Sequence, residues 1–128
     1  MNHNKHKSDE SVQDYLETIY VLSSKVAKVR SIDIANEMSY SKPSVSVAMK
    51  NLRANGYIEV SPEGYITLTE SGFLIAQSVY ERHSLMTKFL VYLGVNPEIA
   101  KEDACMMEHD ISAESFEALK KHINTFIK

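Results

Sequence analysis

The sequence predicts a mainly α-helical protein with one small β-hairpin, arranged as a winged helix-turn-helix followed by an all-helical segment. Two short amphipathic helical patterns, at 31–38 and 43–54, are separated by a brief polar break. Directly after Gly56 the residues change to β-branched and aromatic runs on either side of a Pro/Gly turn, which predicts a hairpin. From residue 69 onward the apolar residues return to helical spacing, which completes the predicted fold class.

Length and composition exclude several classes of protein. The chain has 128 residues, of which 44% are hydrophobic and 24% charged, as in a globular protein with one compact domain or two small ones. No apolar run approaches the roughly 18 residues of a membrane-spanning helix, so we expect no membrane partner. A single cysteine cannot form an intramolecular disulfide, and this favours a cytoplasmic location.

The first predicted helix carries a pair of carboxylates. Ser8 is a candidate N-cap, and apolar residues recur at helical spacing to about Ser23. Asp14 and Glu17 lie three residues apart and therefore share one side of this helix. Two solvated carboxylates are the simple interpretation, and two metal ligands are the alternative.

The predicted helix-turn-helix contains residues that favour the starts and the end of its two helices. Ser31 is a candidate cap for a short helix whose buried side is expected to carry Ile32, Ala35 and Met38. Pro43 suits the first turn of the second helix, because its missing N–H is not needed there. Gly56 suits the residue just beyond the end of that helix.

A local basic patch accompanies this motif in a chain of net charge −3. Residues 25–53 contain six basic and two acidic side chains, a local charge of +4 that is compatible with phosphate binding. For the serines, ordinary helix capping is the alternative to a DNA contact. The candidate DNA-binding residues are Lys28, Arg30, Ser41, Lys42, Pro43, Ser44, Ser46 and Lys50.

The C-terminal helices carry the most chemistry. Thr69 is the expected cap of a long helix that reaches Gly94 and includes His83, Asn96-Pro97 starts a second helix, and Ser112 opens a third. The second helix contains Cys105-Met106-Met107-Glu108-His109, so a thiol, a carboxylate and an imidazole project from one face. All three groups bind transition metals when deprotonated. A buried thiol at Cys105 and a packed core histidine at His83 are the simpler interpretations.

Several motifs, taken in order, resemble the DtxR/MntR family, the diphtheria-toxin-repressor-like metal-dependent transcriptional repressors. The resemblance covers nearly the whole chain. The motifs that carry it are Asp14-Tyr15-Leu16-Glu17-x-Ile19-Tyr20, Ile34-Ala35, Ser41-x-Pro43-Ser44-Val45-Ser46, Leu68-Thr69-x-x-Gly72, Arg82-His83 and Glu108-His109.

The resemblance implies a homodimer with a winged helix-turn-helix DNA-binding domain at 1–72 and a helical metal-binding and dimerisation domain at 73–128. It implies a repressor that binds a palindromic double-stranded operator, senses Mn²⁺ or Fe²⁺, and controls metal-homeostasis genes. By position, the ligands of the two-metal cluster found in manganese-type members match Asp14, Glu17, His83, Glu108 and His109.

Cys105 departs from the manganese-type pattern. It stands where that branch usually has glutamate, whereas the iron-type branch has cysteine there but methionine at the position of Asp14. Carboxylates suit Mn²⁺, and a thiolate favours Fe²⁺, Co²⁺ or Zn²⁺. We therefore expect Mn²⁺ or Fe²⁺, with up to two ions per subunit and with Zn²⁺ or Co²⁺ able to substitute. Manganese is favoured slightly because Asp14 and Glu17 are both present.

Two other functions fit parts of the sequence. A winged-helix regulator could sense an organic ligand without a metal switch, and its carboxylates would then be surface groups. A metal-dependent hydrolase needs an open coordination position, a general base and a substrate cleft. No loop is long or Gly-rich enough to suggest such a cleft, so we do not expect an enzyme.

Overall fold

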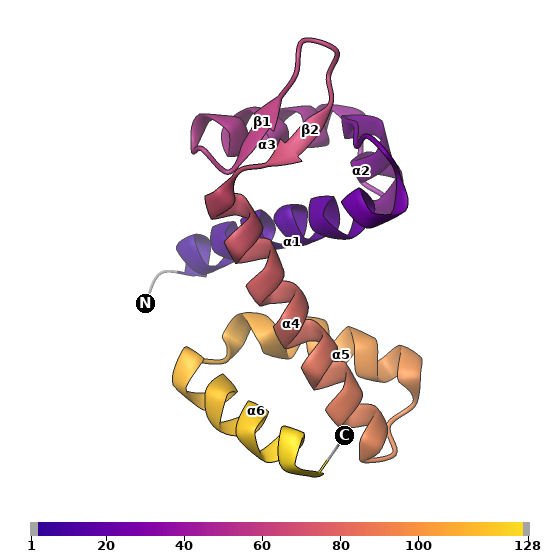
Figure 1. Ribbon diagram of the computed structural model, residues 1–128, viewed down its shortest axis with the longest axis vertical. Coiled ribbons are helices and arrows are strands. Elements are labelled where there is room, and N and C mark those ends of the chain that lie inside the picture. The colour runs from indigo at the N-terminus through magenta and orange to yellow at the C-terminus, as the bar shows by residue number, and fades with distance from the viewer. Residues whose placement is uncertain (1–2, 127–128) are drawn as a thin grey trace. The chain divides into compact units, whose positions relative to one another are not determined.

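The computed structural model describes residues 3–126 of the chain, with side chains described for 11–126. The fold is mainly helical with one two-stranded hairpin, as predicted (Figure 1). No helix in this part of the chain combines the length and apolar character needed to cross a membrane. The elements are α1 His3–Lys25, α2 Ser31–Met38, α3 Lys42–Ala54, β1 Ile58–Val60, β2 Ile66–Leu68, α4 Glu70–Tyr92, α5 Pro97–Asp110 and α6 Ala113–Phe126.

The chain divides into two compact units, residues 1–77 and 78–128. The N-terminal unit contains α1, α2, α3, the hairpin and the start of α4, and the C-terminal unit contains the rest of α4 with α5 and α6. Each unit has its own apolar core.

Helix α1 begins earlier than the sequence suggested. It starts at His3, so Ser8 lies inside the helix and the expected N-cap at that position is wrong. Residues 1–25 contain neither glycine nor proline, and a polar residue that can cap a helix does not by itself end the helix upstream.

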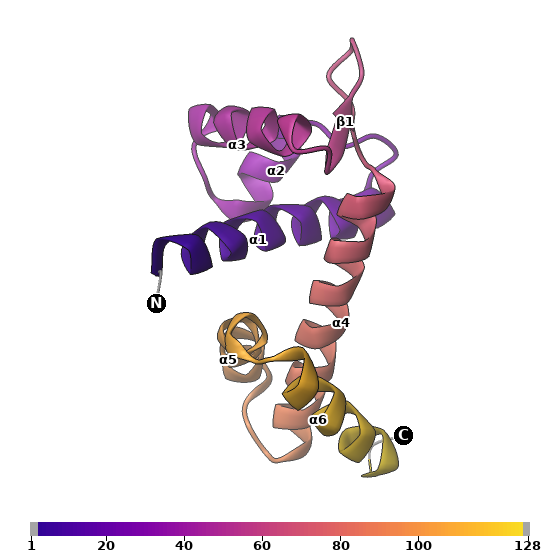
Figure 2. The same cartoon turned by 90° about the vertical axis from the view of Figure 1, so that its left-hand side faces the viewer.

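The helix-turn-helix is confirmed at α2 and α3, which pack against each other (Figure 2). The α2 helix starts at Ser31, so the expected cap at Ser31 is wrong and Arg30 takes the N-cap position. The Arg30 backbone N–H donates a 2.9 Å hydrogen bond to the Asp33 carboxylate. It ends at Ser39, which adopts a left-handed conformation with φ of 57°. Ser41 caps α3 by accepting a 3.3 Å hydrogen bond from the backbone N–H of Ser44.

A third extended segment joins the hairpin. The β1 and β2 strands pair antiparallel, with Val60 opposite Ile66, and Val29 forms an antiparallel bridge to Ile66 on the other side. The Ile66 N–H donates to the Val29 carbonyl at 2.8 Å. Gly64 takes a positive φ of 88° at the tip, which favours glycine.

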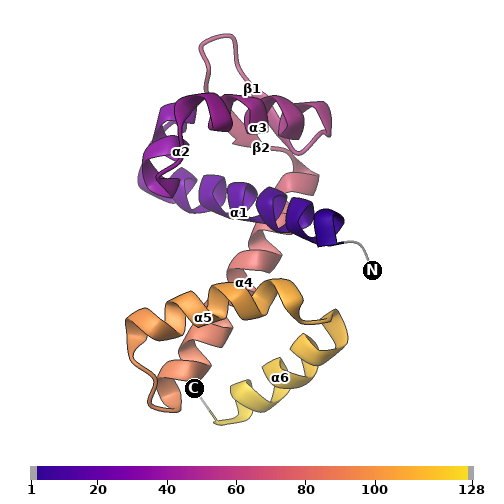
Figure 3. The same cartoon turned by 180° about the vertical axis from the view of Figure 1, so that it is seen from behind.

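The core of the N-terminal unit lies between its helices and the inner face of the hairpin (Figure 3). Along α2 the expected inward stripe is partly wrong, because Ile34 is fully buried whereas Ile32 is 38% exposed. The buried side chains of this core are Tyr15, Leu16, Ile19, Leu22, Val29, Ile34, Ala35, Val45, Met49, Leu52, Ile58, Ile66 and Ala76.

The C-terminal unit has a smaller core. Met86 from α4, Ala104 from α5 and Phe116 from α6 pack together. Asn96 caps α5 by accepting a 2.9 Å hydrogen bond from the Glu98 N–H, as predicted. This small core packs α5 beside the second half of α4, and the packing positions the candidate ligands.

Candidate metal centre and nucleic-acid interface

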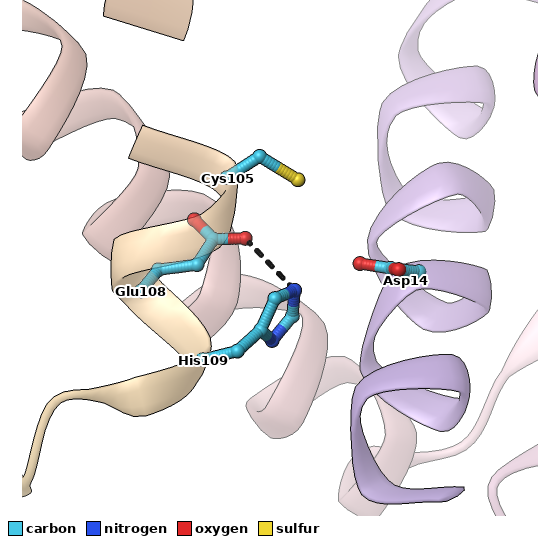
Figure 4. Close-up of side chains that lie close together, drawn as sticks. All are labelled: Asp14, Cys105, Glu108 and His109. Carbon is cyan, nitrogen blue, oxygen red and sulfur yellow. Dashed lines mark ion pairs between the residues drawn. The ribbon is translucent and has the colours of Figure 1, made fainter. Parts of the chain in front are cut away.

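Helix α5 presents three metal-binding groups on one face. Cys105, Glu108 and His109 project from the same side of its last two turns (Figure 4). Each of the three offers one ligand atom, and these atoms lie within 4.8 Å of one another. The i, i+3, i+4 spacing therefore gathers a thiol, a carboxylate and an imidazole as the sequence predicted.

The Glu108 carboxylate lies between two histidines. One oxygen, Oε2, is 3.3 Å from Nδ1 of His83, which α4 supplies, and the other, Oε1, is 3.5 Å from Nε2 of His109. Glu108 is only 2% exposed, and neither oxygen accepts a hydrogen bond from any residue that the structure describes. A buried carboxylate in this state is costly unless a charged partner completes its environment.

These features fit a divalent cation. Two ligand atoms held about 2.1 Å from one ion at angles of 90–110° lie roughly 3.0–3.5 Å apart. Both oxygen–nitrogen distances around Glu108 fall within that range. The donor set of carboxylate, imidazole and thiolate is one that first-row transition metals bind.

Arg82 contributes to this cluster in a way that sequence reasoning missed. Its guanidinium donates a 3.4 Å hydrogen bond to the backbone carbonyl of Glu108 and lies 5.3 Å from the centre of the Phe116 ring. It thereby links α4 to the last turn of α5, where Glu108 and His109 sit. Its place one residue before His83 is the only signal that the sequence offers.

The remaining two predicted metal ligands, Asp14 and Glu17, are carried by α1 in the N-terminal unit. Their spacing of three residues places them on one side of that helix. The backbone carbonyl of Asp14 accepts a 2.8 Å hydrogen bond from the Thr18 hydroxyl.

All eight predicted DNA-binding residues are exposed in the N-terminal unit. Lys42, Pro43, Ser44, Ser46 and Lys50 lie on α3, the second helix of the helix-turn-helix, Ser41 is its cap, and Lys28 and Arg30 flank Val29 in the extended segment. For Ser41 the capping interpretation holds, since its hydroxyl accepts from one backbone N–H and donates to the Ser44 hydroxyl at 2.9 Å.

The same helix has an outward residue that sequence reasoning passed over. Val47 is 59% exposed at the middle of α3, four residues after Pro43 and three before Lys50. An apolar, β-branched side chain is unfavourable on a solvated helix face. Its i, i+4 relation to Pro43 was the available signal, and the two make an apolar stripe between polar groups.

Family comparisons agree with this division of the chain. Residues 8–65 match the N-terminal DNA binding domain of iron dependent repressors, and residues 69–127 match the metal binding and dimerisation domain of the same repressors. The transcriptional regulator MntR of Escherichia coli O157:H7 is 40% identical over 111 residues, which cover 87% of this chain and 72% of that protein.

Solved structures give the same result. The manganese regulator SloR matches with a TM-score of 0.78 and 33% identity over 88% of this chain and 53% of that one. A manganese-dependent transcriptional repressor in complex with manganese matches with a TM-score of 0.80 and 27% identity over 88% of this chain and 52% of that one. The chain thus spans about half the length of these two solved proteins. It belongs to the DtxR/MntR family of iron-dependent repressors, which are metal-dependent transcriptional regulators rather than enzymes, and lies close to the MntR manganese regulators.

Proposed function

We propose that this protein is a homodimeric repressor that binds a palindromic operator when loaded with Mn²⁺ or Fe²⁺ and so controls metal-homeostasis genes. One observation carries the proposal. A buried carboxylate that accepts no hydrogen bond from the described residues lies between two imidazoles, in a chain that also carries a winged helix-turn-helix. DNA binding is assigned to 1–72, and dimerisation and most of the metal ligands to 73–128.

The proposed ligand set contains six residues. Cys105, Glu108, His109 and His83 come from the C-terminal unit, and Asp14 and Glu17 come from α1. Support for adding the α1 pair comes from its carboxylate chemistry, its i, i+3 spacing and its match to ligand positions of manganese-type members. Six donors with Glu108 shared would hold one or two cations per subunit.

The switch follows from the charges of these residues. Asp14, Glu17 and Glu108 are all acidic, so bringing them together without a cation is opposed by repulsion and desolvation. A bound divalent cation supplies the positive charge that makes the approach favourable. Asp14 and Glu17 then tie α1 to the C-terminal unit, which selects the DNA-competent arrangement.

The DNA contacts divide by chemistry. Lys42, Lys50 and the α3 serines are suited to phosphates and base edges, and Lys28 and Arg30 to the phosphate backbone. Pro43 and Val47 are suited to thymine methyl groups in the major groove. Two copies in a dimer would read half-sites about 34 Å apart or at a multiple of that spacing.

Exposed apolar side chains of the C-terminal unit support a second copy of the chain as the partner. Protein interfaces are enriched in large apolar side chains that the free subunit exposes. In this unit the large exposed apolar side chains of the described residues include Val91, Tyr92, Leu93, Ile99, Met106, Met107 and Phe126.

A DNA-binding titration with and without chelator tests the proposal. The duplex is selected from a random pool by the Mn²⁺-loaded protein, and anisotropy is followed with EDTA, Mn²⁺, Fe²⁺ or Zn²⁺ under anaerobic conditions. We expect tight binding only with a transition metal. Equal binding in EDTA would overturn the metal switch and favour a regulator that senses an organic ligand.

A further inference from the structure

The outer face of the wing carries two cations beside one aromatic ring. Val29 bridges Ile66 and both side chains are buried, so their neighbours Lys28, Arg30 and Tyr65 point to the opposite, outer face. Arg30 lies directly across from Tyr65, and Lys28 is the diagonal neighbour. The alternation of side chains along the strands thus gathers all three.

Both cations lie close to the Tyr65 ring. The ammonium nitrogen of Lys28 and the guanidinium carbon of Arg30 are each 4.5 Å from the ring centroid, within the range of a cation–π contact. Lys28 and Arg30 are exposed, and Tyr65 is half-buried. Neither cation forms an ion pair with an acidic side chain of the described residues.

The backbone that carries the two cations is also fixed. The Val29 carbonyl accepts from Ile66 at 2.8 Å, and the Arg30 N–H donates to Asp33 at 2.9 Å. The positive charges of Lys28 and Arg30 repel each other, so an anion that lies between them is favoured. Successive phosphates of a duplex supply such anions along a line.

We propose that Tyr65 is a positioning residue that holds Lys28 and Arg30 in place for the phosphate backbone of DNA. The inference rests on the proposed function and adds to it a residue outside the predicted DNA-binding set. By restricting two flexible side chains before DNA arrives, the ring removes part of the entropy lost on binding.

A double-mutant cycle with the full chain and Mn²⁺ tests the role of the ring. We expect Tyr65→Leu to weaken binding to the selected duplex about five- to thirty-fold per protomer, from two side chains that lose pre-organisation. Tyr65→Phe keeps the ring and is expected to bind like the wild type. In a Lys28→Gln/Arg30→Gln background, Tyr65→Leu is expected to cause no further loss.

The salt dependence of the affinity for DNA is a measurement that a purely structural role would leave unchanged. Lys28→Gln/Arg30→Gln should reduce the slope of log affinity against log salt by about 1.8 per protomer, because two phosphate contacts are lost. Unchanged slope, or an equal loss from Tyr65→Leu in both backgrounds, would overturn the proposal. Thermal unfolding of Tyr65→Leu checks that the wing is intact, because the hydrogen bonds between the main chain of residue 65 and Ser61 do not need the ring.

A spectroscopic measurement separates this inference from the metal switch. In the absence of DNA, the ring current should shift the side-chain protons of Lys28 and Arg30 upfield in the wild type and in Tyr65→Phe, but not in Tyr65→Leu. Absence of that shift would overturn the positioning role even if metal-dependent DNA binding is intact. Presence of the shift, with DNA binding that ignores chelator, would overturn only the metal switch.

Discussion

Each oxygen of the Glu108 carboxylate faces a different imidazole, so this side chain has the largest expected effect on metal binding. Glu108→Gln keeps its size but removes its charge. We expect the affinity for Mn²⁺ to fall by more than the roughly 10–100-fold that is typical when a residue supporting a ligand is lost. Competition with a fluorescent chelator measures this change.

Glu102→Gln is the matched control for that substitution, because Glu102 is exposed on the same helix. Its affinity for Mn²⁺ should equal that of the wild type. Equal losses in both variants would mean that helix charge in general, rather than the buried carboxylate, attracts the cation.

The thiol of Cys105 is expected to bias the centre toward softer metals. With Co²⁺ bound, the wild type should show a near-ultraviolet thiolate-to-cobalt absorption band that Cys105→Ser lacks. Cys105→Glu, an all-oxygen and nitrogen set, should shift the ratio of Mn²⁺ to Co²⁺ affinity toward Mn²⁺. A wild-type cobalt spectrum without the band would show that Cys105 is a packed thiol and not a ligand.

Val47 offers a test of base reading that depends on single methyl groups. Replacing thymine by uracil at a contacted base removes one methyl, and we expect the wild type to lose about 0.8 kcal/mol, or about four-fold in affinity. Val47→Ala should bind both duplexes equally. A uracil penalty of the same size in the variant would assign the methyl contact to another residue, with Pro43 the nearest candidate on α3.

At the scale of elements, the sequence predicted helix starts well where a side chain must satisfy a specific N–H. The caps expected at Asn96 and Thr69 are present, with Gly72 donating to the Thr69 hydroxyl at 3.2 Å. Among the serines, for which capping was the alternative to a DNA contact, Ser41 is a cap, whereas Ser31 is the first residue of α2 and not its cap. Ser8 failed because its capping ability says nothing about whether the preceding residues are already helical. A side chain that can cap a helix therefore marks its start only where the preceding residues cannot be helical.

Buried faces were harder to predict than helix ends. Ile32 and Phe73 occupy apolar positions of the helical pattern, yet they are 38% and 41% exposed. Periodicity identifies a stripe but not its centre, and on α2 the centre falls at Ile34 and Ala35. Which residue is innermost depends on the helices that pack against it, and single-segment patterns do not contain that information.

Gly72 is a position where an element can be broken by one methyl group. A Cβ there would collide with the backbone carbonyl oxygen of Tyr57, which cannot move without disturbing the hairpin. We expect Gly72→Ala to destabilise the protein by about 1–3 kcal/mol, as overpacking does. Chemical denaturation measures the loss, and Gln77→Ala on the exposed side of the same helix should leave stability nearly unchanged.

At the scale of the whole molecule, the sequence predicted the part of the candidate site on α5 but not the contacts that α4 makes with it. The face shared by Cys105, Glu108 and His109 follows from helix geometry alone. The approach of His83 to Glu108 depends on how α4 and α5 pack through Met86 and Ala104, which spacing along the chain cannot give. Arg82, which donates to the Glu108 carbonyl, was missed for the same reason.

The coupling between metal binding and DNA binding can also be tested by measuring how DNA changes the affinity for metal. If metal binding favours the DNA-competent dimer, DNA must tighten metal binding by the same factor, with a coupling of about 1–3 kcal/mol, or 5–150-fold. Mn²⁺ titrations with and without the selected duplex measure this factor directly. Identical Mn²⁺ affinities in the two titrations would show that metal and DNA are bound independently.

Under the proposed function, the position of Glu108 between His83 and His109 would affect how steeply the promoter responds to metal. If two ions share this carboxylate as proposed, the first would hold it in place, and the second would then lose less entropy on binding. Occupancy would then rise sigmoidally with the free metal pool. A modest change in the cell's supply would be enough to turn transcription from on to off.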